Sequence, residues 1–180
     1  PSEHSAIYRF TYPEGADASL LLNISRKIGN SVSMRSGSLN IDKENKRITG
    51  GGTYGGNWNP ANWNMYFALE FDTDIEEIGT WDNGGLKKDS LSLEKPSNNE
   101  HCGAYVKFDT SSTKTVNVKL SISFVSTEKA ESFLDEEISD FNFDAVKEKA
   151  ADTWNEVLGK VELGEQTDEV TKGKFYTAMY

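Results

Sequence analysis

The sequence predicts a mainly β protein, an antiparallel β-sandwich followed by C-terminal helices, which makes the chain α+β overall. Up to about residue 125, apolar and polar residues alternate in about nine short segments, and no helical spacing separates them. Beyond that point the apolar residues recur every three or four positions, as on one face of a helix. We therefore expect a β-sandwich domain at residues 1–125 and a helical linker at residues 126–180.

The first half of the sandwich is indicated by alternation between turn residues. The pattern places strands at residues 6–12, 18–24, 32–35, 38–41 and 46–49. Pro13-Glu14-Gly15 ends the first of these, and Leu20, Leu22 and Ile24 give the second a single apolar face. Ser36-Gly37 stands between the third and fourth segments, where we expect a two-residue hairpin turn.

The later strands are expected at residues 65–71, 75–81, 104–108 and 115–124. In the segment 65–71, Met65 and Phe67 share one face while Tyr66 and Ala68 lie behind it. Apolar side chains on both faces predict a central strand that is covered on both sides. The segment 115–124 instead alternates strictly, so one of its faces should be core and the other solvated.

Helical spacing begins with a stripe formed by Ala130, Phe133, Leu134 and Ile138. Asn142 is placed to cap a second helix, and Gly159 is placed to stop it. Thr167 could cap a third helix. The sequence ends on the aromatic-rich run 175–180, which we interpret as an element whose continuation has been removed.

Two long loops are expected, at residues 50–63 and 83–103. The first contains the candidate substrate-binding residues, which are Asn57, Trp58, Asn59, Asn62 and Trp63. Aromatic faces stack on the C–H faces of sugar rings, and asparagine amides offer donors and acceptors to hydroxyls. The alternative is that the two tryptophans close the end of the sandwich.

Charge and cysteine content exclude several classes of function. The net charge is −10, and residues 128–169 hold 14 Asp and Glu against 4 Lys. An acidic chain without a basic stripe is a poor nucleic-acid binder, so we expect no nucleic-acid partner. We also expect no membrane span, because no apolar run approaches the required ~20 residues. Cys102 stands alone and cannot form an internal disulfide.

The sequence predicts no catalytic or metal-binding residues in this chain. It has no strand–Gly-x-Ser-x-Gly–helix pattern, and His4 and His101 lack the spacing of zinc ligands. The acidic run at 72–77 (DTDIEE) lacks the spacing of a calcium loop. The helix carboxylates, such as Glu136 and Glu137, are expected on a solvated face and are assigned no catalytic role.

A set of short stretches carries a resemblance to a known family. They are residues 5–15 (SAIYRFTYPEG), 48–51 (ITGG), 65–71 (MYFALEF), 121–130 (SISFVSTEKA), 143–146 (FDAV), 154–155 (WN) and 175–180 (FYTAMY). In this order they resemble the N-terminal part of glycoside hydrolase family 92, the calcium-dependent α-mannosidases. The loop from Asn57 to Trp63 matches no pattern of that family.

The resemblance implies a supersandwich of the galactose mutarotase-like kind, joined by linker helices to an (α/α)-barrel that lies outside this chain. It also implies an enzyme that removes terminal α-linked mannose from glycans with inversion, using a carboxylic acid, a carboxylate and Ca²⁺. The acid, the base and the calcium ligands are expected outside these residues. The chain alone should then be inactive.

The implied partners are a mannose-containing glycan and the protein's own catalytic barrel, and the implied location is periplasmic or secreted. Two other functions remain open from the residues themselves. One is an autonomous carbohydrate-binding sandwich, and the other is a structural or protein-interaction domain whose acidic helices meet a basic partner.

Overall fold

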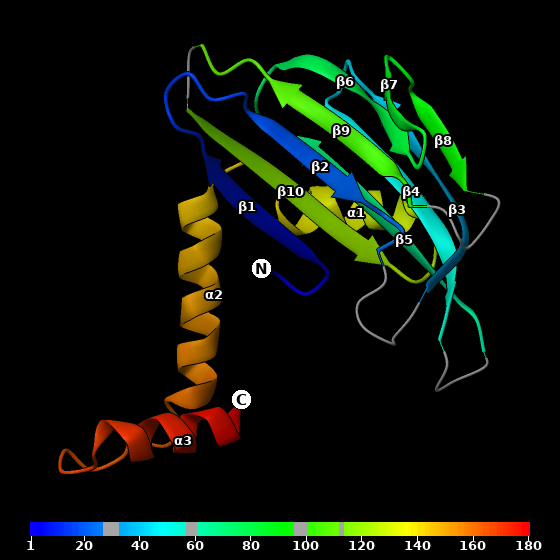
Figure 1. Cartoon of the computed structure of the whole chain (residues 1–180). Coiled ribbons are helices and arrows are strands. Elements are labelled where there is room, and N and C mark those ends of the chain that lie inside the picture. The colour runs from blue at the N-terminus through cyan, green and yellow to red at the C-terminus, as the bar shows by residue number, and fades with distance from the viewer. Residues whose placement is uncertain (27–32, 57–60, 96–100, 112–113) are drawn as a thin grey trace. The chain divides into compact units, whose positions relative to one another are not determined.

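The structure is a computed structural model, and it describes residues 1–26, 33–56, 61–95, 101–111 and 114–180. Within them ten strands form two antiparallel sheets and three helices follow (Figure 1). The strands are β1 (Ser5–Thr11), β2 (Ser19–Asn23), β3 (Ser33–Asp42), β4 (Arg47–Gly55), β5 (Trp63–Phe71), β6 (Ile75–Asp82), β7 (Gly85–Lys88), β8 (Ser92–Lys95), β9 (Gly103–Phe108) and β10 (Thr115–Ser123). The helices are α1 (Thr127–Glu137), α2 (Phe143–Leu158) and α3 (Glu169–Met179).

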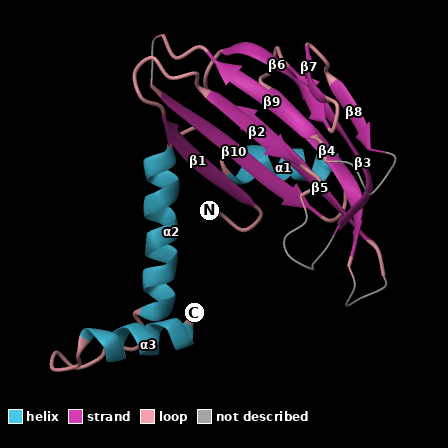
Figure 2. Ribbon diagram, in the orientation of Figure 1, coloured by secondary structure: helices cyan, strands magenta, loops and turns pink. Residues whose placement is uncertain are grey.

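The two sheets pack face to face as a β-sandwich, which confirms the expected fold class (Figure 2). One sheet has six strands in the order β1-β10-β5-β4-β3-β8, and the other has four in the order β2-β9-β6-β7. A single buried cluster joins them, with residues such as Ile48, Phe71 and Val118 from the first sheet and Ile78 and Val106 from the second. Burial of these apolar side chains is the main force that holds the layers together.

Strand β5 is central and covered on both sides, as its sequence predicts. It pairs with β10 on one side and with β4 on the other. Phe67 and Leu69 face the sandwich core, while Ala68 on the opposite face is fully buried under Ala130 and Leu134 of α1.

The expected hairpin turn at Ser36-Gly37 is wrong. Strand β3 is continuous and contains a register shift between Met34 and Ser36, which marks a β-bulge. A Cβ at Gly37 would collide with the Met34 Cε and lie 2.6 Å from the Gly51 carbonyl oxygen. The glycine therefore allows close packing within the sheet rather than a reversal of the chain.

The loop expected at residues 50–63 begins later than the sequence suggests. Strand β4 continues through the three glycines to Gly55, and Gly50, Gly51 and Gly52 pair with residues of β5. The space that side chains would fill at these positions holds the rings of Phe67 and Tyr66 and the Met34 methyl group. The glycines allow neighbouring side chains to approach the backbone of β4 closely. From the sequence alone, a glycine with this role cannot be distinguished from a glycine in a loop.

The second expected loop, at residues 83–103, also contains strands. Asp82 pairs with Gly85, so Asn83 and Gly84 form a two-residue turn between β6 and β7, and β8 then joins the edge of the six-stranded sheet. These strands have four residues each, and the described side chains of β7 are all exposed. Such short segments lack the alternation by which longer strands are recognised.

The chain divides into two units, Pro1–Phe143 and Asp144–Tyr180. In the first unit, α1 packs on the outer face of the six-stranded sheet, over β10 and β5. Ser126 caps this helix by accepting from the Lys129 amide at 3.1 Å, and Ser121 Oγ donates to the Ala130 carbonyl at 2.5 Å.

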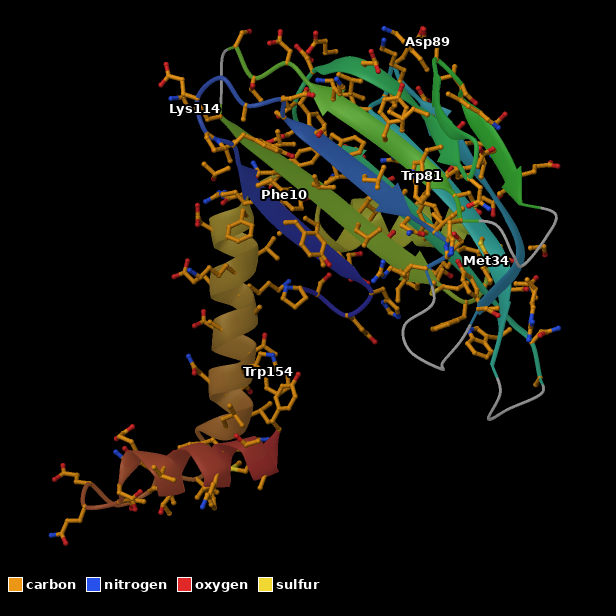
Figure 3. The ribbon with its side chains drawn as sticks, in the orientation of Figure 1. Phe10, Met34, Trp81, Asp89, Lys114 and Trp154 are labelled. Carbon is orange, nitrogen blue, oxygen red and sulfur yellow. The ribbon has the colours of Figure 1, made fainter. Side chains whose placement is uncertain are left out.

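The second unit contains most of α2 and all of α3. Gly159 follows α2, as predicted, whereas Asp168 caps α3 in place of the expected Thr167, accepting from the Thr171 amide at 3.0 Å. Trp154 of α2, labelled in Figure 3, packs on Tyr180 with ring centroids 4.8 Å apart. Neither helix buries a residue fully within this unit. Across the described residues, no helix has the length and apolar character needed to cross a membrane.

Candidate functional site

The five predicted sugar-contact residues belong to the connection between β4 and β5, and the structure describes two of them. Asn57, Trp58 and Asn59 lie outside the described residues. Asn62 is exposed immediately before β5, and Trp63 is the half-buried first residue of that strand.

The strand register decides which way Trp63 faces. Trp63 pairs with Tyr54 and shares the core-facing side of β5 with Met65 and Phe67. Tyr54 packs against the core and donates its hydroxyl hydrogen to the Ile24 carbonyl at 3.1 Å. Burial raises the pKa of the Tyr54 phenol, so this side chain remains a neutral donor at physiological pH.

Asn62 lies over Gly55 at the end of β4. A Cβ at Gly55 would meet the Asn62 Oδ1 and would stand 3.1 Å from Arg35 Nε. The missing side chain thus lets an exposed amide and an exposed guanidinium approach the same point of the backbone. Arg35 was not predicted from the sequence, because only the pairing of β3 with β4 brings it to this hairpin.

The acidic run at residues 72–77 does not form a calcium site. Asp72 accepts from the Asn117 amide and side chain at 2.9 and 2.7 Å, and Asp74 pairs with Lys46 at 2.5 Å. Glu77 accepts from Lys88 and from the Tyr105 hydroxyl. In the described part of the chain, no three His, Cys, Asp or Glu side chains gather where they could hold a metal ion. These residues therefore do not fit the Ca²⁺ that the family implies.

His4 lies in a polar cluster with Ser2 and Glu137. The Glu137 carboxylate accepts from Ser2 Oγ at 2.6 Å and from the His4 amide at 2.9 Å, and it contacts His4 Nδ1 at 2.7 Å. The His4 ring stacks on Phe133 at 3.8 Å. Ser2 and His4 both bond to the carboxylate rather than to each other, so the arrangement ties the N-terminal residues to α1 and forms no nucleophile–base pair.

Burial acts to raise the pKa of Glu137, but the bonds from Ser2 and His4 outweigh it and lower the pKa below its ordinary value. Glu137 therefore remains ionised at neutral pH and keeps its bonds to Ser2 and His4.

A second cluster fixes α1 to the sheet. Arg47 of β4 pairs with Glu70 of β5 at 2.5 Å and with Asp135 and Glu131 of α1 at 2.7 and 3.4 Å. Burial opposes the charge of Arg47, yet the bonds from Glu70 and Asp135 raise its pKa overall. Lys119 lies beside this cluster and is almost fully buried, 3.5 Å from Glu70.

Comparison with known protein families identifies the family of this chain. Residues 1–123 match the N-terminal domain of glycosyl hydrolase family 92, and residues 129–180 match the family's catalytic domain. The chain belongs to glycosyl hydrolase family 92. The resemblance found in the sequence is thereby confirmed, and the two matches meet where β10 ends and α1 begins.

Individual relatives are similar over nearly the whole chain. A protein of Arthroderma benhamiae described as an uncharacterized secreted glycosidase is 21% identical over 192 residues, covering 99% of this chain and 25% of its own length. An inverting mannosidase of Bacteroides thetaiotaomicron superposes with a TM-score of 0.82 at 26% identity, covering 98% of this chain and 22% of that one. An α-mannosidase of the same organism gives 0.84 at 26% identity, with coverages of 100% and 24%. The chain thus spans about a quarter of the length of these relatives.

Proposed function

We propose that this chain is the N-terminal portion of an exo-acting glycoside hydrolase that removes terminal α-linked mannose from glycans, and that the chain is inactive alone. The observation that carries the proposal is the ordered pair of family 92 matches, first to the N-terminal domain and then to the catalytic domain. The names of the two Bacteroides structures support mannose as the sugar, since both are mannosidases.

The inactivity of the chain alone follows from what glycoside hydrolysis requires. An inverting glycosidase holds two carboxyl groups on either side of the scissile bond within a pocket. Two of the least exposed carboxylates described here are instead committed to structural partners, Glu70 to Arg47 and Glu137 to His4. We infer that the acid, the base and the calcium ligands belong to the rest of the full-length protein. The role of the sandwich is then to hold α1 and to present loops to that catalytic part.

We infer a contribution to glycan binding from the β4–β5 hairpin, through Asn57, Trp58, Asn59, Asn62 and Trp63. The exposed Asn62 amide supports it, because a planar amide can bind two neighbouring sugar hydroxyls. If the chain is an autonomous binding module, mannosides should shift its intrinsic tryptophan fluorescence, and Trp58→Ala or Trp63→Ala should abolish the shift. The absence of any response would favour a supporting role for the sandwich.

We also propose that the full-length protein is exported, to the periplasm or beyond the cell. The support is the relative that is described as secreted. Fractionation of cells that produce the full-length protein would test this, and recovery in the cytosol alone would contradict it.

The enzymatic proposal is tested by mannose release from α-1,2-mannobiose. Full-length protein should release mannose, a metal chelator should abolish the release, and added Ca²⁺ should restore it. The isolated 180-residue chain should release none. Activity that a chelator leaves unchanged would argue against the calcium assignment, and the absence of any release would argue against the substrate.

A further inference from the structure

A polar groove of about 300 Å³ crosses the outer face of the six-stranded sheet, next to the start of α1. Its floor consists of three rows of residues that face one another across β3, β4 and β5. The rows are Ser36–Thr53–Asn64, Ser38–Gly51–Tyr66 and Asn40–Thr49, and the last row stops before β5, where α1 covers Ala68. Because alternate residues of a strand point to opposite faces, these side chains lie on the side away from the sandwich core.

The lining of this outer groove is neutral and rich in hydrogen-bonding groups. Its side chains are five Ser and Thr hydroxyls, two Asn amides and one Tyr phenol, together with four glycines, and no charged residue lines it among those described. This contrasts with a chain in which 27% of residues are charged.

Most of these side chains have no hydrogen-bond partner among the residues that the structure describes. The Thr53 hydroxyl donates to Asn64 Oδ1 at 2.9 Å. This bond uses the amide oxygen of Asn64 and does not involve its amide nitrogen. The side chains of Ser38, Asn40 and Thr49 make no hydrogen bond to another described residue. The groove therefore presents a row of available donors and acceptors, several of them on exposed residues.

An aromatic ring forms part of the floor. A Cβ at Gly51 would meet Cδ1 of Tyr66 and stand 3.2 Å from its Cε1, so the ring lies across the strand directly over the glycine. Tyr66 is half-buried in this position, and its ring supplies an apolar surface in an otherwise polar groove. A flat ring beside hydroxyls and amides matches a pyranose, which has C–H faces and a rim of hydroxyl groups.

We propose that this groove binds a neutral segment of a glycan, by stacking on Tyr66 and by hydrogen bonds to Ser38, Asn40 and Asn64. The proposal rests on the proposed function for the class of ligand. The absence of a lining cation is unfavourable for phosphate, nucleic acid or an anionic polysaccharide. The polar lining is equally unfavourable for an apolar ligand, which would leave these hydroxyls unpaired.

Binding of the full-length protein to soluble α-mannan, measured by affinity electrophoresis, tests the proposal. Ser38→Lys extends a long charged side chain into the groove, and Asn40→Ala removes one amide. We expect Ser38→Lys to weaken mannan binding about tenfold and Asn40→Ala about threefold. Ser19→Lys is the matched control, because Ser19 is an exposed serine on β2 of the other sheet and its variant should bind as the wild type does.

Hydrolysis of α-1,2-mannobiose separates this proposal from the enzymatic one. The groove variants should keep wild-type kcat/KM on this disaccharide, because it is too short to reach a second site. Undiminished mannan binding in both groove variants overturns the proposal even if the enzyme is active. Binding of heparin but not of mannan also overturns it, since the ligand would then be anionic. Mannan binding that depends on Ser38 in a protein without mannosidase activity would support the groove and refute the enzymatic assignment.

Discussion

Glu70 helps to hold the cluster that fixes α1 to the sheet, because its carboxylate is shared between two cations. Its side chain is 19% exposed and contacts both Arg47 and the nearly buried Lys119, which is 4% exposed. Glu70→Ala leaves both cations without this partner and should destabilise the sandwich by about 2–4 kcal/mol in chemical denaturation. Glu14→Ala removes the far more exposed pair with Lys114 and should cost less than about 1 kcal/mol. Equal losses would show that the Glu70 contacts contribute no more than a surface pair.

Glu137 gives the folded state a dependence on pH. Its folded-state pKa lies below the ordinary value of 4.5, so its stabilising contribution is complete above that value and is lost as the pH falls through the lowered one. The difference in unfolding free energy between the wild type and Glu137→Gln should be largest near neutral pH and should shrink as the pH falls below about 4. A difference that stays constant from about pH 7 to about pH 3 would contradict the role given to the carboxylate.

Gly50 is a core residue, although it stands in a run that resembles a flexible loop. A Cβ there would lie 2.5 Å from the Ser38 carbonyl oxygen and 2.8 Å from the Phe67 ring. Gly50→Ala should therefore cost about 1–3 kcal/mol through overpacking. Gly164→Ala is the control, since a Cβ at Gly164 would meet nothing within 4 Å. A Gly50→Ala protein as stable as the control would mean that β4 and β5 are less tightly packed than described.

At the scale of elements, α1 lies where the two family matches meet, within the unit that contains the sandwich. Its residues from 129 onward match the catalytic domain of the family. The helix nevertheless packs on the sandwich, where it covers the outer face of β5 and β10. Leu134 is fully buried in this contact. Leu134→Ala should cost about 2–5 kcal/mol, whereas Val125→Ala, at a residue 75% exposed, should cost almost nothing. A small effect at Leu134 would imply that α1 separates readily from the sheet.

The same scale explains what the sequence could and could not predict. Strands β5 and β10 are long and carry clear apolar patterns, so periodicity alone identifies them. Strands β3 and β4 contain glycines that accept neighbouring side chains, and local rules assign glycine to turns instead. The outer groove and the approach of Arg35 to Asn62 depend on cross-strand register, which a single sequence does not specify. The assignment of Asn57, Trp58, Asn59, Asn62 and Trp63 to sugar binding stays a prediction.

At the scale of the whole molecule, the described residues gather no cluster that could hold a metal ion, and the chain spans about a quarter of the length of its relatives. Under the proposed function, the rigid β-layer supports loops and helices while the chemistry takes place in the rest of the full-length protein. The ion clusters and the buried face of α1 are then the means by which the sandwich holds the first helix matched to the catalytic domain.

The most direct test of this account is the anomeric configuration of the sugar released by the full-length protein. Proton NMR of the reaction with an α-mannoside should detect β-mannose first, followed by slow mutarotation to the equilibrium mixture. Initial release of α-mannose, or failure to release mannose at all, would contradict the proposal that the full-length protein is an inverting α-mannosidase.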